Sequence, residues 1–291
     1  MIALSVIWGY NWLVMKECLR FCPPLTLAAL RTMIGSISLF IFIMVRRQSL
    51  RPEALLPTLL LGLTGTTACI GLVTWSLYLG GVGKTAVLVY VMPFWVLILA
   101  WPVLKERIYG LQWPAVFLAC GGLILVIRPW ELAGSTMGGF LAIMGGVAWA
   151  VSAIITKIIR KRVIFDLVSL TAWQMFLGAV PLTAAALLFD STPVNWTPYF
   201  AVALFYSAVI SQAVALLLWF YILQELPAGS ASLGTLATPV IGTVAGAVQL
   251  GERPTGAELA GMALIVAGLA LLAYQGILQA SEVSRYVKRG G

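Results

Sequence analysis

The chain has 291 residues, of which 61% are hydrophobic and only 10% are charged, and its mean hydropathy is +1.01. Soluble domains carry about 25% charged residues, so this composition excludes a soluble protein, whose surface it could not cover with polar groups. The net charge is +8, but the basic residues lie between apolar blocks, which indicates membrane topology rather than a nucleic-acid surface.

The apolar blocks predict helices that cross a membrane. Each block is close to the roughly 20 residues that a helix needs to span a bilayer, and the alternation typical of strand barrels is almost absent. In chain order, the expected spans cover residues 2–15, 24–45, 54–78, 85–104, 111–128, 137–157, 168–189, 198–222, 229–249 and 256–278. We therefore expect an all-α integral membrane protein with ten transmembrane helices. The first block starts at Ile2 without a cleavage pattern, so we expect it to be retained.

Residues that bind metals form no recognisable pattern in this chain. There is no histidine, and the spacing of the four cysteines fits neither a metal site nor a disulfide framework. Cys69 and Cys120 lie inside apolar blocks, where a free cysteine behaves as a small hydrophobic residue. We expect no metal ion and no cofactor.

The two halves of the chain match each other at an offset that drifts only from 141 to 146 residues. The matching pairs are Trp8 and Trp149, Lys16 and Lys157, Trp75 and Trp219, and Pro93 and Pro239. The sequence Leu-Lys-Glu-Arg at 104–107 also returns as Leu-Gly-Glu-Arg at 250–253, and a Gly-rich helix follows each. We expect a tandem duplication, with five-helix repeats at 1–132 and 133–280 and a basic cytoplasmic tail at 281–291.

Five spans per repeat predict that the second repeat is inverted in the membrane. With the N-terminus inside, 12 of the 18 Lys and Arg residues fall in inside connections or the tail, 5 fall outside, and Arg31 is left within a span. Cytoplasmic connections carry the excess of basic residues. We therefore expect both termini in the cytoplasm.

The two five-span halves, the Leu-x-Glu-Arg turn after a proline-bearing helix and the Gly-rich last helices resemble the drug/metabolite transporter superfamily, in particular its EamA-type branch. The aromatic-rich first and third spans are most similar to the YddG-type amino-acid exporters. The resemblance covers essentially the whole chain. It implies a bacterial inner-membrane protein that moves amino acids or other small metabolites outward through a cavity between the repeats.

Inverted-repeat transporters hold their substrate near the bilayer midplane, between the repeats. We therefore expect the substrate site among polar and aromatic residues at helical spacing in the central spans. The candidates are Trp8, Asn11, Trp12, Trp75, Tyr78, Tyr90, Trp149, Ser152, Gln212, Trp219, Thr235 and Thr238. Packing against lipid or neighbouring helices stays an alternative for any single tryptophan. Asn11 and Gln212 favour a functional site, because an unpaired amide in hydrocarbon costs a few kcal/mol.

Prolines and charges within the spans suggest further roles. Pro93 and Pro239 are expected to kink their helices in the middle, and the symmetric placement favours a gate over a static bend. Arg31 lies about 10 Å from the end of its span and either snorkels to the headgroups or faces the interior. Glu106 and Glu252 are expected to begin the helices that follow them and to complement the helix dipole.

These features predict a secondary transporter, not an enzyme, that exports amino acids by alternating access, with aromatic and apolar ones among them. We expect broad specificity for a zwitterion held mainly by neutral groups, lipid as the surroundings, no nucleic-acid partner, and a monomer or weak homodimer. The absence of histidine and the placement of all ten acidic residues in loops or at span ends favour a uniporter.

Two alternatives stay open at this point. An exporter of nucleotide sugars or cationic drugs belongs to the same superfamily, but a phosphorylated substrate would need several basic residues facing the cavity, and Arg31 is the only one. An integral membrane enzyme acting on lipids would need acid–base or metal-binding residues near the interface. The scattered carboxylates argue against it.

Overall fold

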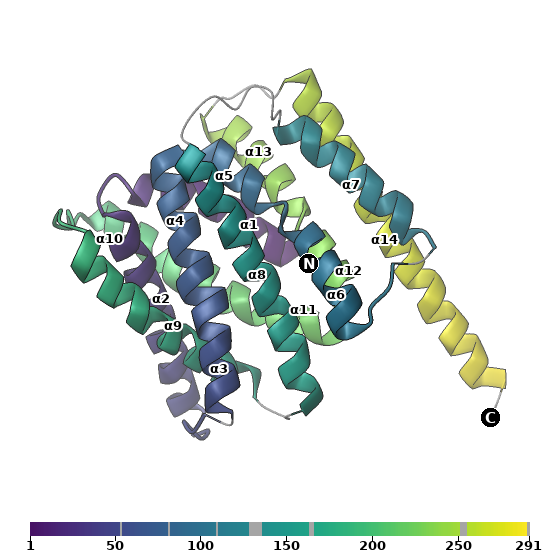
Figure 1. Cartoon of the computed structure of the whole chain (residues 1–291), viewed down its shortest axis with the longest axis horizontal. Coiled ribbons are helices and arrows are strands. Elements are labelled where there is room, and N and C mark those ends of the chain that lie inside the picture. The colour runs from purple at the N-terminus through teal and green to yellow at the C-terminus, as the bar shows by residue number, and fades with distance from the viewer. Residues whose placement is uncertain are drawn as a thin grey trace.

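The computed structural model describes residues 1–52, 54–80, 82–108, 110–127, 136–162, 166–250 and 255–289. In these ranges all regular structure is helical (Figure 1), as predicted. Five helical stretches among them are long and apolar enough to cross a membrane: Pro24–Val45, Leu55–Leu79, Met137–Arg160, Leu167–Phe189 and Pro198–Glu225. Shorter apolar helices cover Met92–Leu104, Gln112–Leu125 and Leu259–Leu272. Each expected span contains a helix, and the number that cross the membrane stays a prediction.

Two corresponding spans contain π-helical stretches. The third span consists of α3 (Leu55–Leu61), η1 (Gly62–Ala68) and α4 (Cys69–Gly80). The eighth consists of α10 (Pro198–Phe205), η3 (Tyr206–Val214) and α11 (Ala215–Glu225). A π-helix is rare, has a wider turn than an α-helix and is often found at functional sites. The same irregularity therefore occurs at matching places in the two halves.

The fourth and ninth spans are each divided into two helices. The fourth comprises α5 (Val82–Val89) and α6 (Met92–Leu104), and the ninth comprises α12 (Ala228–Gly234) and α13 (Ala237–Leu250). Pro93 and Pro239 stand in the first turn after these breaks, so the expectation of a mid-helix kink is wrong. The physical reason is that amides of the first turn have no partner within the helix, so a proline there removes no hydrogen bond.

The remaining helices are α1 (Ile2–Cys18), α2 (Pro24–Val45), α7 (Gln112–Ile127), α8 (Thr136–Arg162), α9 (Leu167–Phe189) and α14 (Gly256–Arg289). The Asp166 side chain begins α9 by accepting a hydrogen bond from the Ser169 amide at 2.8 Å. α14 continues through Ser281 to Arg289, so the expected tail is an extension of the last helix.

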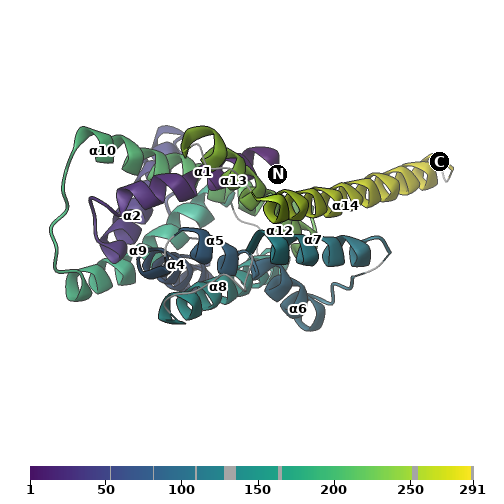
Figure 2. The same cartoon turned by 90° about the horizontal axis from the view of Figure 1, so that it is seen from above.

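Helices from the two halves pack in reciprocal pairs. α2 lies against α9, and α7 lies along α14 in both views of the chain (Figures 1 and 2). α1, the first span, packs against α13 in the ninth, and α8, the sixth span, packs against α6 in the fourth. These last two pairs place one helix of each broken span, α6 and α13, against the other half of the chain.

Glycines allow the closest of these contacts. A Cβ atom added at Gly178 of α9 would lie 2.6 Å from the Gly62 carbonyl oxygen, and one at Gly35 of α2 would lie 2.6 Å from the Ala208 carbonyl oxygen. In the same way, a Cβ atom added at Gly122 of α7 would lie 2.6 Å from the Gly261 carbonyl oxygen of α14. One added at Gly268 of α14 would lie 2.9 Å from the Ala115 carbonyl oxygen of α7. Small residues let membrane helices approach this closely.

Candidate functional site

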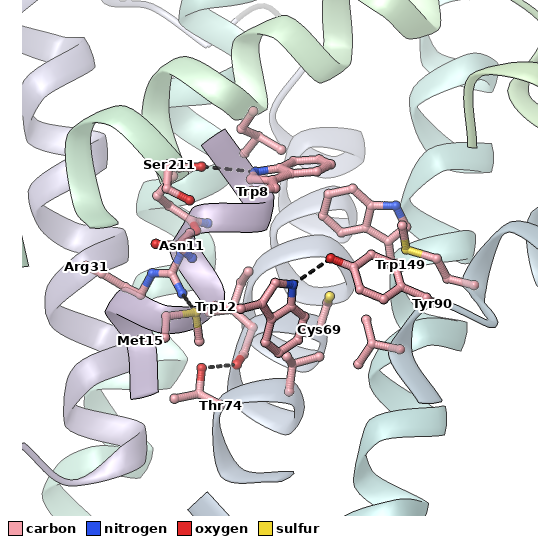
Figure 3. Close-up of a pocket in the computed structure, with 16 residues that line it drawn as sticks. Trp8, Asn11, Trp12, Met15, Arg31, Cys69, Thr74, Tyr90, Trp149 and Ser211 are labelled. Atoms are coloured by element: carbon pink, nitrogen blue, oxygen red, sulfur yellow. Dashed lines mark hydrogen bonds between the residues drawn. The ribbon is translucent and has the colours of Figure 1, made fainter. Parts of the chain in front are cut away.

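A cavity of about 110 Å³ lies where the two halves meet (Figure 3). That volume is several times what one water molecule needs. The predicted residues that line it are Trp8, Asn11 and Trp12 of α1, Arg31 of α2, Tyr90 in the break before α6, Trp149 of α8 and Gln212 of η3. The broken fourth span and the π-helix η3 both contribute residues to its wall.

Three indole rings form one cluster at the cavity. The ring centroids of Trp8 and Trp149 are 5.2 Å apart with an interplanar angle of 79°, an edge-to-face arrangement that aromatic rings favour. Trp219 of α11 lies behind both, at 6.1 Å from Trp8 and 5.5 Å from Trp149, and is only 1% exposed. Trp8 Nε1 donates to the Ser211 carbonyl oxygen at 3.1 Å, which fixes the ring against η3.

A second aromatic contact crosses the cavity to the broken helix. Trp12 Nε1 donates to the Tyr90 hydroxyl at 2.6 Å, and their ring centroids are 6.0 Å apart. Tyr90 lies between α5 and α6, where the backbone leaves its helical path. Any movement of this break would therefore move a side chain of the cavity wall.

The opposite end of the cavity is polar. Arg31 is 4% exposed, and its Nη1 contacts the Met15 sulfur at 2.7 Å, while its Nε has no hydrogen-bond partner. The Asn11 Oδ1 atom is also buried without a partner. A thioether is only a weak acceptor. Among the described residues the single ion pair joins Arg20 and Glu17, so Arg31 faces the cavity without a carboxylate partner in that part of the chain.

Two predicted residues are not brought to this cavity. Trp75 and Tyr78, at the end of α4, are 36% and 59% exposed and line a separate hollow of about 440 Å³ with Phe189 and Asp190. The cavity is instead lined by Cys69, Ile70, Val73 and Thr74 on the other side of α4. The wall of the cavity along this helix is therefore mostly apolar.

Other candidates lie close to the cavity without lining it. Ser152 donates to the Trp149 carbonyl oxygen at 2.7 Å, and Thr235 donates to the Ser232 carbonyl oxygen at 2.6 Å. Thr238 is buried at the start of α13. The Ser152 and Thr235 hydroxyls are therefore satisfied by carbonyl oxygens three residues earlier in the chain.

Sequence reasoning missed the apolar part of the lining, which includes Cys69, Val73, Val89, Met92 and Leu216. No signal distinguishes them, because a side chain that faces lipid and one that faces an apolar cavity are drawn from the same residue types.

Glu106 links the two halves at the end of α6. Lys105 ends this helix with a left-handed φ of 59°, a conformation that usually takes glycine, and the matching residue of the second half is Gly251. The turn directs Glu106 back to α12, where its Oε2 accepts a hydrogen bond from the Ala228 amide at 2.8 Å. Glu106 thus complements the dipole of α12 rather than of the helix that follows it, which corrects our expectation. Glu252 lies outside the described residues.

A second carboxylate links the end of α9 to the start of α2. Asp190 Oδ2 accepts from the Thr26 amide at 2.6 Å and from the Thr26 hydroxyl at 2.8 Å, at the start of α2. Nearby, the Asn195 amide donates to the Phe21 carbonyl oxygen at 2.8 Å. Cross-contacts between the halves therefore exist on both sides of the cavity.

The sequence model of the EamA-like transporter family matches residues 1–128 and residues 136–274. The chain belongs to the EamA-like transporter family. This membership confirms the resemblance to the EamA-type branch and makes the chain a multi-pass membrane transporter of that type. Both the family and its relatives are named as transporters, which favours a carrier over an enzyme.

Relatives match along nearly the whole chain. The uncharacterized transporter YoaV of Bacillus subtilis (strain 168) is 28% identical over 276 residues, which cover 92% of this chain and 93% of the relative. The probable amino-acid metabolite efflux pump of Escherichia coli (strain K12) is 28% identical over 276 residues, covering 91% of this chain and 90% of the relative. A solved crystal structure with 18% identity shares the fold, with a TM-score of 0.77 over 93% of both chains.

Proposed function

We propose that this EamA-family transporter exports amino acids across the inner membrane of a bacterium, through the cavity between its two halves, by alternating access. The observation that carries the proposal is the cavity itself, which combines a cluster of tryptophans with buried hydrogen-bonding groups from both halves. Aromatic walls contact many apolar side chains and discriminate weakly among them. We therefore infer broad specificity, with aromatic and apolar amino acids among the substrates.

The reciprocal packing of the helices supports two inverted five-helix repeats with boundaries at 1–132 and 133–280. The second span pairs with the seventh and the fifth with the tenth, and the π-helical stretches and the broken spans occur at corresponding places. Two repeats related in this way can tilt against each other around a fixed central site. The excess of basic residues in alternate connections supports cytoplasmic termini.

The acidic residues support uniport. Proton-driven carriers usually keep an ionisable acid or histidine at the substrate site. None of the acidic side chains that the structure describes lines the cavity, and Glu106 accepts a hydrogen bond outside it. Arg31 cannot shuttle a proton near neutral pH, because a guanidinium keeps its charge in proteins. We infer that the substrate runs down its own gradient.

A counterflow panel tests the proposal directly. The purified full chain would be reconstituted in vesicles with equal pH on both sides, loaded with unlabelled solute and given labelled amino acids, nucleotide sugars or cationic dyes outside. We expect counterflow of several apolar and aromatic amino acids, and none in protein-free vesicles. Counterflow of nucleotide sugars or dyes without any amino acid would overturn the proposal.

The same vesicles test the coupling. Uptake should persist at equal pH and should not increase when an inward proton gradient is imposed. If uptake required the gradient, uniport would be wrong and amino-acid transport would still stand. Glu106→Gln would then be the first variant to examine.

A further inference from the structure

Arg31 carries a charge that the cavity does not neutralise. It is the charged residue in the lining, it is 4% exposed, and its Nε donor has no partner. Its contact with the Met15 sulfur leaves the charge uncompensated, because a thioether carries no negative charge. A buried cation without a counter-ion is strongly disfavoured, so a ligand that brings a carboxylate to this end of the cavity gains binding free energy.

Asn11 offers the complementary group beside it. Its Oδ1 atom is a buried acceptor without a partner, and it lines the same cavity. Figure 3 shows the Arg31 guanidinium next to Asn11 and Met15, while Tyr90 and Trp149 lie at the other end of the labelled group. One end of the cavity therefore holds an unpaired donor with positive charge and an unpaired acceptor. The other end holds aromatic rings and an unpaired donor, Trp149 Nε1, that carries no charge.

We propose that Arg31 binds the α-carboxylate of the substrate and that Asn11 Oδ1 accepts a hydrogen bond from its α-ammonium group. The substrate side chain then lies towards the rings of Trp8, Trp149 and Tyr90. This inference rests on the proposed amino-acid function and assigns its head-group recognition to two residues. The sequence predicts that mainly neutral groups hold the zwitterion, and this assignment adds the positive charge of Arg31 to them.

The arrangement sets a rule for specificity. A molecule must bring both head groups, because a missing carboxylate leaves Arg31 unpaired and a missing ammonium leaves Asn11 unpaired. Sites built to hydrogen-bond a group reject analogues that lack it far more strongly than apolar pockets reject a missing methylene. Organic cations gain nothing at Arg31, so aromatic amines should be poor ligands despite the tryptophans.

Competition in vesicles tests this rule. Counterflow of labelled L-phenylalanine would be measured in the presence of one of three unlabelled competitors. These are L-phenylalanine itself, phenethylamine, which lacks the carboxylate, and 3-phenylpropanoate, which lacks the amine. In the unmodified protein, we expect half-inhibition by each analogue to need a concentration about ten-fold or more above that of L-phenylalanine. This ranking needs no variant, so it holds even where a substitution prevents folding.

Variants then assign the two groups. Arg31→Gln should weaken inhibition by L-phenylalanine and by 3-phenylpropanoate about ten-fold or more and leave phenethylamine unchanged. Arg31→Lys should recover part of the loss, because it keeps the charge without the fork of donors. Asn11→Leu should weaken L-phenylalanine and phenethylamine but not 3-phenylpropanoate. Arg46→Gln is the matched control, since Arg46 ends the same helix but is exposed over the Phe42 ring.

The outcomes separate the two proposals. If neither L-phenylalanine nor any other amino acid were carried by the unmodified protein, the proposed function would fail. If L-phenylalanine were carried but phenethylamine inhibited equally, the assignment of Arg31 would fail and amino-acid transport would stand. Equal effects of Arg31→Gln on all three ligands would also overturn the assignment, because a purely structural role would not depend on the carboxylate.

Discussion

The contact between Trp8 and Trp149 joins the first and sixth spans, which are counterparts in the two halves. The two rings are held in different ways: Trp8 donates a hydrogen bond to the backbone of η3, while Trp149 packs against both Trp8 and Trp219. A cluster of this kind can stack on a ligand without large side-chain movement, because its rings already hold each other. The two indoles should therefore contribute to binding together.

Replacement of both rings tests their role. Trp8→Ala with Trp149→Ala removes aromatic contacts worth about 0.5–1.5 kcal/mol each beyond their buried area, so we expect counterflow of aromatic amino acids to fall about ten-fold or more. Trp101→Ala is the control, since Trp101 is 64% exposed on the outside of α6. Unchanged transport of every amino acid in the double variant would show that the substrate binds elsewhere.

Sequence reasoning located this cluster because the residues concerned are rare and symmetric. Trp8 and Trp149 match at the offset of the duplication, and buried amides stand out in an apolar span. It failed for Trp75 and Tyr78, which follow η1 in the chain. A π-helix has more residues per turn than an α-helix, so the face of each later residue cannot be predicted by counting 3.6 residues per turn. Trp75 and Tyr78 were therefore expected on the side of α4 that faces the cavity, whereas they line the separate hollow.

The irregular helices η1 and η3 occur where the two halves touch. η1 packs against α9, and η3 packs against α2. In each contact a glycine of the regular helix meets the backbone of the π-helical span, Gly178 at Gly62 and Gly35 at Ala208. Sequence patterns predicted these spans but not their π-helical turns or the breaks beside Pro93 and Pro239, because both depend on packing between distant segments.

Gly178 tests how tightly these elements fit. In Gly178→Ala the new Cβ atom would meet backbone at Gly62, which cannot move aside as a side-chain end can. Overpacking of this kind costs about 1–3 kcal/mol, so we expect the thermal unfolding midpoint of the purified protein to fall by a few degrees. Gly121→Ala is the matched control on α7, because nothing lies within 4 Å of its added Cβ atom. A midpoint that moved equally in both variants would contradict the close fit.

The orientation in the membrane determines on which side each hydrogen bond between the two halves lies. With both termini inside, the Glu106–Ala228 contact lies on the cytoplasmic side and the Asp190–Thr26 contact on the outer side. Loop charges predicted this orientation from the sequence, since charge counts need no knowledge of packing. Loop charges do not predict to which side of the membrane the cavity is closed, because that depends on contacts between the repeats.

Cysteine labelling tests the orientation. Gln48→Cys and Ser191→Cys, each placed alone in a cysteine-free chain, lie at exposed positions, and we expect an impermeant maleimide to label only Ser191→Cys on intact cells. Cys22, retained alone, is a control for burial on the same side. Burial raises the pKa of its thiol to about 12, so it stays protonated at neutral pH and should react only after denaturation. Labelling at Gln48→Cys but not at Ser191→Cys would reverse the assigned topology.

The length of α14 has a practical consequence for imaging this small protein. Its 34 residues extend about 51 Å at 1.5 Å per residue, whereas the hydrocarbon core is about 30 Å thick. The last turns, which extend beyond the other helices in Figures 1 and 2, therefore continue the helix out of the hydrocarbon core. A soluble domain joined in helical register at Arg289 would be held at a fixed angle, and would give single-particle electron microscopy the rigid landmark that a detergent-covered transporter of 31.3 kDa otherwise lacks.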